Sequence, residues 1–564
     1  MPEHDVLIIG AGLAGQRAAL AAAQSGVSVA IMSKVHPVRS HSVAAAGGIN
    51  AAISVTDDWR SHAYDTVKGS DYLGDQDAIE AMCREAPGEV MHLEHIGVTF
   101  HRNDAGELDL RAFGGASINR TAYVADITGQ AILHVLYEQL MRQAGSVVRY
   151  EEWFTTSLVI DADGTCTGVI ARNIRTGQIE AFAAKSVILA SGGAGQCFKP
   201  TTNALICTAD GIAQALRVGA PLMDMEMIQY HPTTLLENGF LITEGARGEG
   251  AHLLNANGER FMSTAAPNKM ELASRDVVSR AEQIEINEGR GVGPDGQGVY
   301  LDITVVPRKR TLESLREIVN IGRDFAGVDI TREPIIVRPG QHYIMGGVKT
   351  DIHGRTPITG LYAAGEVACV SVHGGNRLGA NSLLDTLIFG RRAGEHAAER
   401  ARSTAMPARS PARLREDELM IKEIIARPRK GRRVSELKAE LGTTMNRYCA
   451  VFRDEDGLQS ALDTVKRLQE EAKSAYIDDR GSVFNQDVLG AIELGYMLDA
   501  AETMVLSAIE RKESRGAQFR TDFPERDDAQ WLKHINVTLG EDGARRISYS
   551  PVTITQWQPE VRKY

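Results

Sequence analysis

The 564-residue sequence predicts an α/β fold divided into several domains, and three observations support this prediction. A chain of this length is too long for a single hydrophobic core. Its 43% hydrophobic and 24% charged residues are the balance of an ordinary globular protein. Its 55 glycines include many that stand in short runs between apolar segments, which is typical of tight turns between strands and helices.

Charge and cysteine usage exclude several classes of function. The net charge of −11 is the opposite of the basic excess that a nucleic-acid partner requires. None of the six cysteines is spaced as Cys-x-x-Cys, so we predict no metal or iron–sulfur site in this chain. We expect neither a membrane span nor a signal peptide, because no apolar run is long enough and the first strand starts near Val6.

The chain opens with the pattern of a dinucleotide-binding βαβ unit. An apolar run ends at Gly10-Ala11-Gly12-Leu13-Ala14-Gly15, an alanine-rich helix is expected as far as Gln24, and a second strand is expected at 27–31. Gly10 permits the tight turn, Gly12 lets a pyrophosphate approach the backbone, and Gly15 lets the helix pack closely on the strand. The pyrophosphate is then expected at the helix N-terminus.

Two residues at the end of the second strand argue against a simple NAD-binding protein. Ser33 and Lys34 stand where an acidic residue would hold the ribose hydroxyls of NAD. A serine hydroxyl can still bond a ribose, so the prediction of a bound nucleotide stands.

The rest of the chain suggests that this nucleotide-binding domain is interrupted and then resumed. Further strands are expected at 157–160, 168–171 and 186–190, and another short strand leads into a glycine turn at 365. Helical spacing of apolar residues at 458–468 and 488–498 predicts a helical region after a proline-containing linker. The predicted domains are 1–231 and 342–405 (nucleotide-binding), 232–341 (inserted), 406–514 (helical) and 515–564 (C-terminal, small and irregular).

One loop carries a specific resemblance. The segment Arg39-Ser40-His41-Ser42, followed by Gly47-Gly48, resembles the flavin-attachment loop of the succinate dehydrogenase and fumarate reductase flavoprotein family. The similarity continues through almost the whole chain, as far as 522–534. It implies an FAD-binding Rossmann-like domain interrupted by an α+β capping domain, then a helical domain and a small C-terminal domain. It also implies FAD bonded covalently, through its 8α carbon, to His41.

The resemblance extends to the residues that contact the flavin. It identifies as FAD-binding residues Gly10, Ala11, Gly12, Gly15, Ser33, Lys34, Ser40, His41, Ser42, Gly47, Gly48, Asp210, Glu366, Ser382 and Leu383.

Several polar motifs provide what the oxidation of a dicarboxylate requires. Cations and donors are needed at both ends of the substrate, and arginine forks, histidines and threonines supply them. By resemblance, the carboxylates are held by His231, Thr243, His342 and Arg377. Arg275 matches the proton-transfer residue, with Glu244 and Arg247 as a relay. Because an arginine has a pKa above ~12, this role suits a proton conduit, or an acid in the fumarate-reducing direction.

The resemblance implies oxidation of succinate to fumarate, or the reverse, by a subunit of respiratory complex II. Electrons would pass to an iron–sulfur subunit, and through it to a membrane anchor and quinone. The expected location is peripheral, on the cytoplasmic side of a prokaryotic inner membrane; a mitochondrial chain without its targeting segment is the alternative. The direction stays open, because Ala46 stands where relatives commonly carry Gln or Glu.

Three other interpretations compete with this one. L-aspartate oxidase is a stand-alone flavoenzyme on the same fold, but it lacks the loop histidine that His41 matches. Adenylylsulfate reductase also lacks it and binds a sulfur oxyanion. A nucleotide-binding protein without enzymatic activity would not need the clustered histidines and arginines.

Overall fold

The computed structural model describes residues 2–563, and its central layer is a seven-stranded sheet. The strands lie in the order β6-β2-β1-β9-β8-β7, and β16 also pairs with β9. Strands β1, β2, β6, β9 and β16 pair in parallel, whereas β7 and β8 are antiparallel. The bounds are β1 (Glu3–Ile9), β2 (Val29–Ser33), β6 (Val147–Glu151), β7 (Trp153–Ile160), β8 (Cys166–Asn173), β9 (Ile179–Leu189) and β16 (Leu361–Ala363).

The first turn of the chain requires glycine, because a side chain at Gly10 or Gly15 would collide with the backbone. A Cβ atom on Gly10 would lie 2.1 Å from the backbone oxygen of Ala190, and Gly10 has a φ of +110°. A Cβ on Gly15 would lie 1.9 Å from the backbone oxygen of Gly10. Helix α1 (Leu13–Gln24) is thereby packed directly on the end of β1. The second strand, expected at 27–31, runs from Val29 to Ser33.

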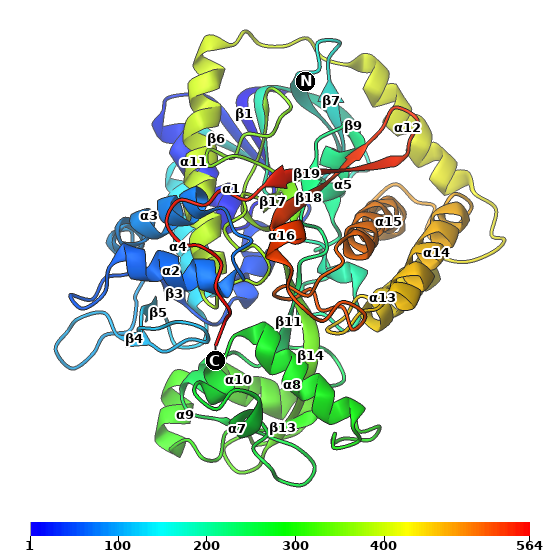
Figure 1. The fold of residues 1–564 in the computed structure, drawn as a ribbon. Helices are drawn as coiled ribbons and strands as arrows, with labels where there is room; N and C mark the ends of the chain where they lie inside the picture. Colours follow the sequence, from blue (N-terminus) through cyan, green and yellow to red (C-terminus); the bar gives the residue numbers. More distant parts are fainter. Residues whose placement is uncertain (1, 564) are drawn as a thin grey trace.

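Helices cover both faces of this sheet (Figure 1). Helix α11 packs along α1, and β3, β4 and β5 form a small separate sheet at one side. The bounds are α2 (Trp59–Gly69), α3 (Gln76–His95), α4 (Thr128–Arg142), α5 (Asp210–Arg217), α11 (Asn381–Ser403), β3 (Ile49–Asn50), β4 (Leu110–Arg111) and β5 (Thr121–Ala122).

The inserted segment forms a capping domain with its own hydrophobic core, at the bottom of Figure 1. Its sheet has the order β11-β14-β13-β12. The antiparallel strands β11 and β14 carry the chain in and out, and the predicted limits at 231/232 and 341/342 fall inside them. The bounds are β11 (Ile228–Leu235), α6 (Gly245–Gly248), β12 (His252–Leu254), α7 (Met262–Ala265), α8 (Arg275–Asn287), β13 (Val299–Asp302), α9 (Arg308–Ser314), α10 (Arg316–Ile321) and β14 (Ile335–Ile344).

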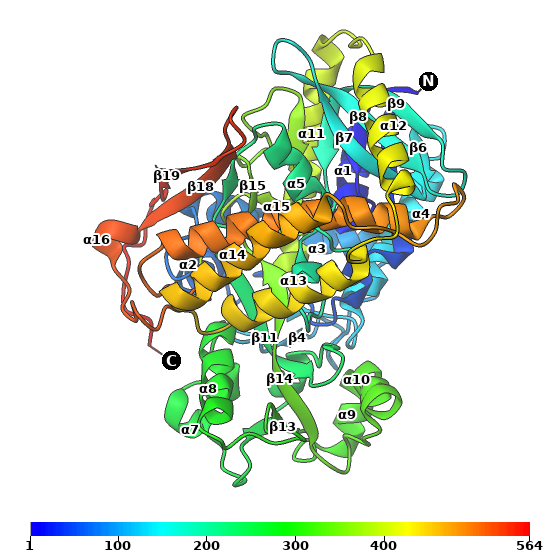
Figure 2. The same ribbon diagram turned by 90° about the vertical axis from the view of Figure 1, so that its right-hand side faces the viewer.

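The helical region after the linker packs against the nucleotide-binding domain, and α13, α14 and α15 lie side by side (Figure 2). The bounds are α12 (Pro411–Ala426), α13 (Val434–Tyr448), α14 (Glu455–Ala472) and α15 (Gln486–Glu510). Both apolar stretches with helical spacing lie within α14 and α15. Within residues 2–563, no helix combines the length and hydropathy needed to cross a bilayer.

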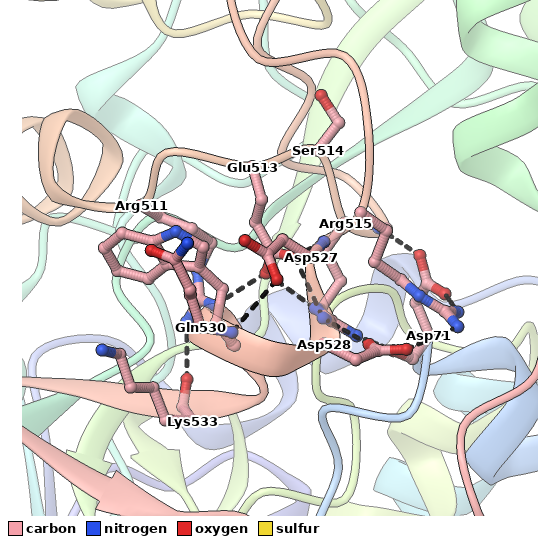
Figure 3. Close-up of polar contacts among 12 residues, drawn as sticks. Asp71, Arg511, Glu513, Ser514, Arg515, Asp527, Asp528, Gln530 and Lys533 are labelled. Atoms are coloured by element: carbon pink, nitrogen blue, oxygen red, sulfur yellow. Dashed lines mark hydrogen bonds and ion pairs between the residues drawn. The ribbon is translucent and has the colours of Figure 1, made fainter.

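The C-terminal region adds strands to a second sheet of the nucleotide-binding domain, in the order β17-β15-β10-β18-β19. It is further anchored by the buried ion pairs of Figure 3, in which Arg515 bridges Glu513 and Asp528 and donates to the backbone oxygen of Asp71. The bounds are β10 (Leu222–Met223), β15 (Gly347–Lys349), β17 (Ala368–Cys369), α16 (Asp528–Trp531), β18 (Lys533–Leu539) and β19 (Arg545–Pro551).

Candidate functional site

A cavity runs from the first glycine turn to the capping domain. All but two of the predicted site residues line it. The first exception is Gly15, which packs α1 on β1. The second is Arg247, which is buried behind Glu244. The cavity therefore joins the predicted nucleotide end to the predicted substrate end without interruption.

At the nucleotide end of the cavity, a ligand can contact the protein backbone directly. Gly12 precedes the first turn of α1 and has no side chain to occupy the amide groups of that turn, which suits a pyrophosphate. A Cβ on Gly12 would lie 3.2 Å from Oγ of Ser42, so a larger residue would narrow the cradle. The Oγ of Ser40 is buried without a hydrogen-bond partner in the described chain, which leaves it for a ligand. These features fit an FAD.

Ser33 and Lys34 play different parts in the structure. The Ser33 hydroxyl donates to the backbone oxygen of Val35 at 2.5 Å. The Lys34 ammonium lies 2.7 Å from a carboxylate oxygen of Asp210 and 2.9 Å from Glu493. Both Lys34 and Asp210 line the cavity, but part of their hydrogen-bonding capacity is used to fix each other.

The His41 loop is fixed from both sides. Nδ1 of His41 accepts a hydrogen bond from the backbone N–H of Ala204 at 3.3 Å, which leaves Nε2 for a further bond. Burial lowers the pKa of His41 to about 4, so the ring is neutral at neutral pH. Arg111 donates to the backbone oxygens of Ala46 and Gly47, which holds the glycine end of the loop.

The remaining predicted flavin contacts lie opposite this loop. Glu366 accepts a hydrogen bond from the backbone N–H of Ile344 at 3.1 Å, and burial raises its pKa to about 7. Ser382 and Leu383 stand in the first turn of α11, where Oγ of Ser382 accepts from Arg377 at 3.3 Å. Gly48, with a φ of +133°, lies too close to Thr121 to carry a side chain.

The four predicted substrate-binding residues converge at the cap end of the cavity. The rings of His231 and His342 lie 4.9 Å apart, and burial, reinforced by neighbouring arginines, lowers the pKa of both well below its usual value. Thr243 is buried and lines the same cavity. Arg377 is 2% exposed, its Nε has no hydrogen-bond partner in the described chain, and burial lowers its pKa to about 9.

The predicted relay residues form a connected row. Nε of Arg275 donates to Glu244 at 2.7 Å, and Nη2 of Arg247 lies 3.7 Å from the same carboxylate oxygen. Although burial opposes ionisation of Glu244, the two guanidinium groups lower its pKa. The row leads away from the cavity into the capping domain.

Two residues of the site were missed by sequence reasoning. Oε1 of Gln229 accepts from Arg275 at 2.9 Å and from Arg377 at 3.0 Å, so it spaces the two arginines. Gln229 lies two residues before His231 on the same strand, so both side chains point to the same face of the sheet. That spacing is the sequence pattern from which Gln229 could have been predicted. Arg111 belongs to no recognisable motif, so its contact with the loop at Ala46 and Gly47 could not be predicted from the sequence.

A Rossmann-type domain with a glycine-rich turn is joined through one cavity to a cluster of histidines and arginines under the capping domain. This combination defines a flavin-dependent oxidoreductase that acts on small anions. The family model described as "FAD binding domain" matches residues 5–383, and "Fumarate reductase flavoprotein C-term" matches residues 438–564. The chain belongs to the succinate dehydrogenase and fumarate reductase flavoprotein family, as the resemblance predicted.

Individual relatives match along their whole length. The chain is 45% identical to the succinate dehydrogenase flavoprotein subunit of Rickettsia conorii, over 99% of this chain and 97% of the relative. It is 44% identical to the fumarate reductase flavoprotein subunit of Mycobacterium tuberculosis, over 100% and 99%. Among solved structures, the flavoprotein of Escherichia coli quinol fumarate reductase matches at 40% identity with a TM-score of 0.95, over 100% and 99%. Adenosine-5-phosphosulfate reductase shares the fold at 19% identity and a TM-score of 0.82.

Proposed function

We propose that this chain interconverts succinate and fumarate by hydride transfer to an FAD tethered at His41. The observation that carries the proposal is Arg377, a buried guanidinium that has no carboxylate within 4.0 Å in the described chain. A substrate carboxylate would supply the missing partner. The neutral rings of His231 and His342, with the hydroxyl of Thr243, supply donors for a second carboxylate.

FAD, when bound, supplies the ring atom that accepts the hydride. Gly12, Ser40 and Ser42 would hold its nucleotide part, and Glu366 and Ser382 would lie along the rest of it. Arg275 removes the proton from the carbon next to the one that gives the hydride, and Glu244 receives it. In the reverse direction Arg275 donates that proton. The cap excludes water from the site while this happens.

The same proposal makes the chain one subunit of a respiratory complex. Its relatives are named as flavoprotein subunits, and one matching structure is a quinol–fumarate reductase with menaquinol. An iron–sulfur subunit would take electrons from the flavin and pass them to a membrane anchor and quinone. The chain would then be peripheral, on the cytoplasmic side of a prokaryotic inner membrane. The stand-alone L-aspartate oxidase is not favoured, because the nearly full-length matches are named as a succinate dehydrogenase flavoprotein subunit and a quinol fumarate reductase.

The tether at His41 is tested by denaturing electrophoresis with fluorescence detection. Wild-type protein should keep a fluorescent flavin in its band, because a covalent bond survives unfolding. His41→Ser should bind FAD in the native state, lose it on denaturation and fail to oxidise succinate. His36→Ser changes a histidine five residues earlier and should keep the tether. Release of all flavin from the acid-precipitated wild type would refute the proposal.

A further inference from the structure

Glu282 has a carboxyl group that is buried in the capping domain and takes no part in the site described above. The residue is 0% exposed, and neither carboxylate oxygen has a hydrogen-bond partner among residues 2–563. Burial raises its pKa well above the usual value, against the opposing effect of Arg247. A buried carboxyl without partners is costly for folding, so its presence calls for an explanation.

The position of Glu282 on its helix relates it to the proton-transfer arginine. Helix α8 begins at Arg275, and Glu282 follows seven residues later, which is two helical turns and the same face. The two residues are therefore about 10 Å apart along the helix axis. One face of α8 thus carries Arg275 at the substrate and Glu282 deeper in the cap.

The charges of both of these residues act on Arg247. Its Nη1 donates to the backbone oxygen of Glu271, but its Nε and Nη2 are buried without a hydrogen-bond partner in the described chain. Charges at Glu244, Arg275, Glu282 and Glu271 all act on it, and burial lowers its pKa. Nε of Arg247 and both carboxylate oxygens of Glu282 therefore lack hydrogen-bond partners, and the charges of the two residues act on each other.

We infer that Glu282 is the outer member of the proton relay that begins at Arg275, exchanging a proton with Arg247. This inference rests on the proposed function. During succinate oxidation one proton arrives from Arg247 and one leaves toward solvent, so Glu282 returns to its starting state. In fumarate reduction the same proton moves inward. No electrons pass through the residue.

A route from Glu282 to solvent continues along the same helix. Glu285 follows three residues later, at the spacing of neighbouring side chains on a helix surface, and is 8% exposed. Its carboxylate accepts from Nε of Arg290 at 2.6 Å, and the Arg290 side chain is 33% exposed. The row of charged groups therefore reaches the surface of the capping domain.

The raised pKa of Glu282 and the lowered pKa of Arg247 bring the two groups closer in proton affinity, which eases exchange between them. A purely structural role would need only a side chain of similar shape at this position. A relay role and a structural role therefore predict different results for a substitution that removes the titratable proton.

The test compares Glu282→Gln, Glu282→Met and Glu282→Asp in the holoenzyme. We expect Gln and Met each to lower kcat about tenfold in both directions, with KM for the dicarboxylate unchanged. The solvent isotope effect on kcat should rise, because proton movement becomes slower. Asp keeps a titratable carboxyl and should recover most of the rate. Glu313→Gln, a change at an exposed glutamate on α9 of the same domain, is the matched control.

Two results would overturn the inference. Wild-type kcat with an unchanged solvent isotope effect in Glu282→Gln and Glu282→Met would show that no proton passes through this residue. Equal losses in all three variants, with raised KM and lowered melting temperature, would show a packing role instead. A wild-type holoenzyme that does not interconvert succinate and fumarate would refute the proposed function itself, whatever the variants do.

Discussion

The substrate end of the cavity and the C-terminal region bury charge in opposite ways. In the C-terminal cluster every nitrogen of the Arg511 and Arg515 guanidiniums has a hydrogen-bond partner, and Glu513 accepts from both arginines (Figure 3). At the substrate end, Arg377 is just as buried, yet its Nε lacks a partner in the described chain. The satisfied charges of the C-terminal cluster hold the domains together, whereas the proposed function has a ligand complete the charge of Arg377.

Buried histidines show the same contrast. Burial alone would lower the pKa of His534, but the carboxylates of Asp224 and Asp75 raise it to about 10. No carboxylate offsets the burial of His231 or His342, and neighbouring arginines lower their pKa further. The site is therefore rich in arginine charge and neutral histidine, which suits a dianionic substrate.

The largest effect is expected at Arg275. Arg275→Gln removes the group that carries the substrate proton, and turnover should fall by at least about 10³-fold. Dicarboxylate binding should remain largely intact, because Arg377 and the histidines are unchanged. Steady-state kinetics with a dye acceptor measures the loss, and Arg332→Gln, an exposed arginine of the same domain, is the control. Near-normal turnover would remove Arg275 from the relay.

A smaller effect on stability should separate the two kinds of buried charge. Arg515→Met removes one of the two arginine partners of Glu513 and of Asp528, and the free energy of unfolding should fall by about 3–5 kcal/mol. Urea unfolding measures this change. Arg546→Met breaks an exposed ion pair with Asp542 and should cost under about 1 kcal/mol. Equal losses in the two variants would contradict the structural role of the cluster.

A third effect should appear as a pH dependence of stability. His534 has a folded pKa of about 10 against 6.5 for an ordinary histidine, so its contribution is complete below about pH 6.5. It should decline by about 1.4 kcal/mol per pH unit as the pH rises toward 10. Comparing urea unfolding of wild type and His534→Gln at pH 6.5 and 9 isolates this contribution. A difference between the two proteins that does not shrink with pH would rule it out.

Sequence predicted most of the fold, because its main signals are local. The glycines at 10, 12 and 15 dictate a turn whose geometry admits no larger residue, and apolar spacing marked α14 and α15. The boundaries of the inserted domain could be predicted only approximately from the sequence. Residues 231 and 341 lie inside long strands that pair with each other, so neither boundary falls at the end of a strand.

The site was predictable only where residues occur in motifs. His41, His342 and Arg377 stand in recognisable segments, whereas Arg111 and Gln229 act through contacts between distant parts of the chain. Glu282 illustrates the same limit, since a glutamate in a helical pattern predicts an exposed side chain and only the fold buries it.

Titration of the holoenzyme with malonate, a dicarboxylate that cannot react, tests the central claim most directly. Flavin absorbance reports binding at the unsatisfied charges. Wild type should bind one malonate per flavin, and Arg377→Met should bind at least about 100-fold more weakly, because a charge-assisted pair is lost. The same substitution should leave urea unfolding of the ligand-free protein unchanged, unlike Arg515→Met. Unaltered malonate affinity in Arg377→Met, or a loss of stability equal to that of Arg515→Met, would contradict the account.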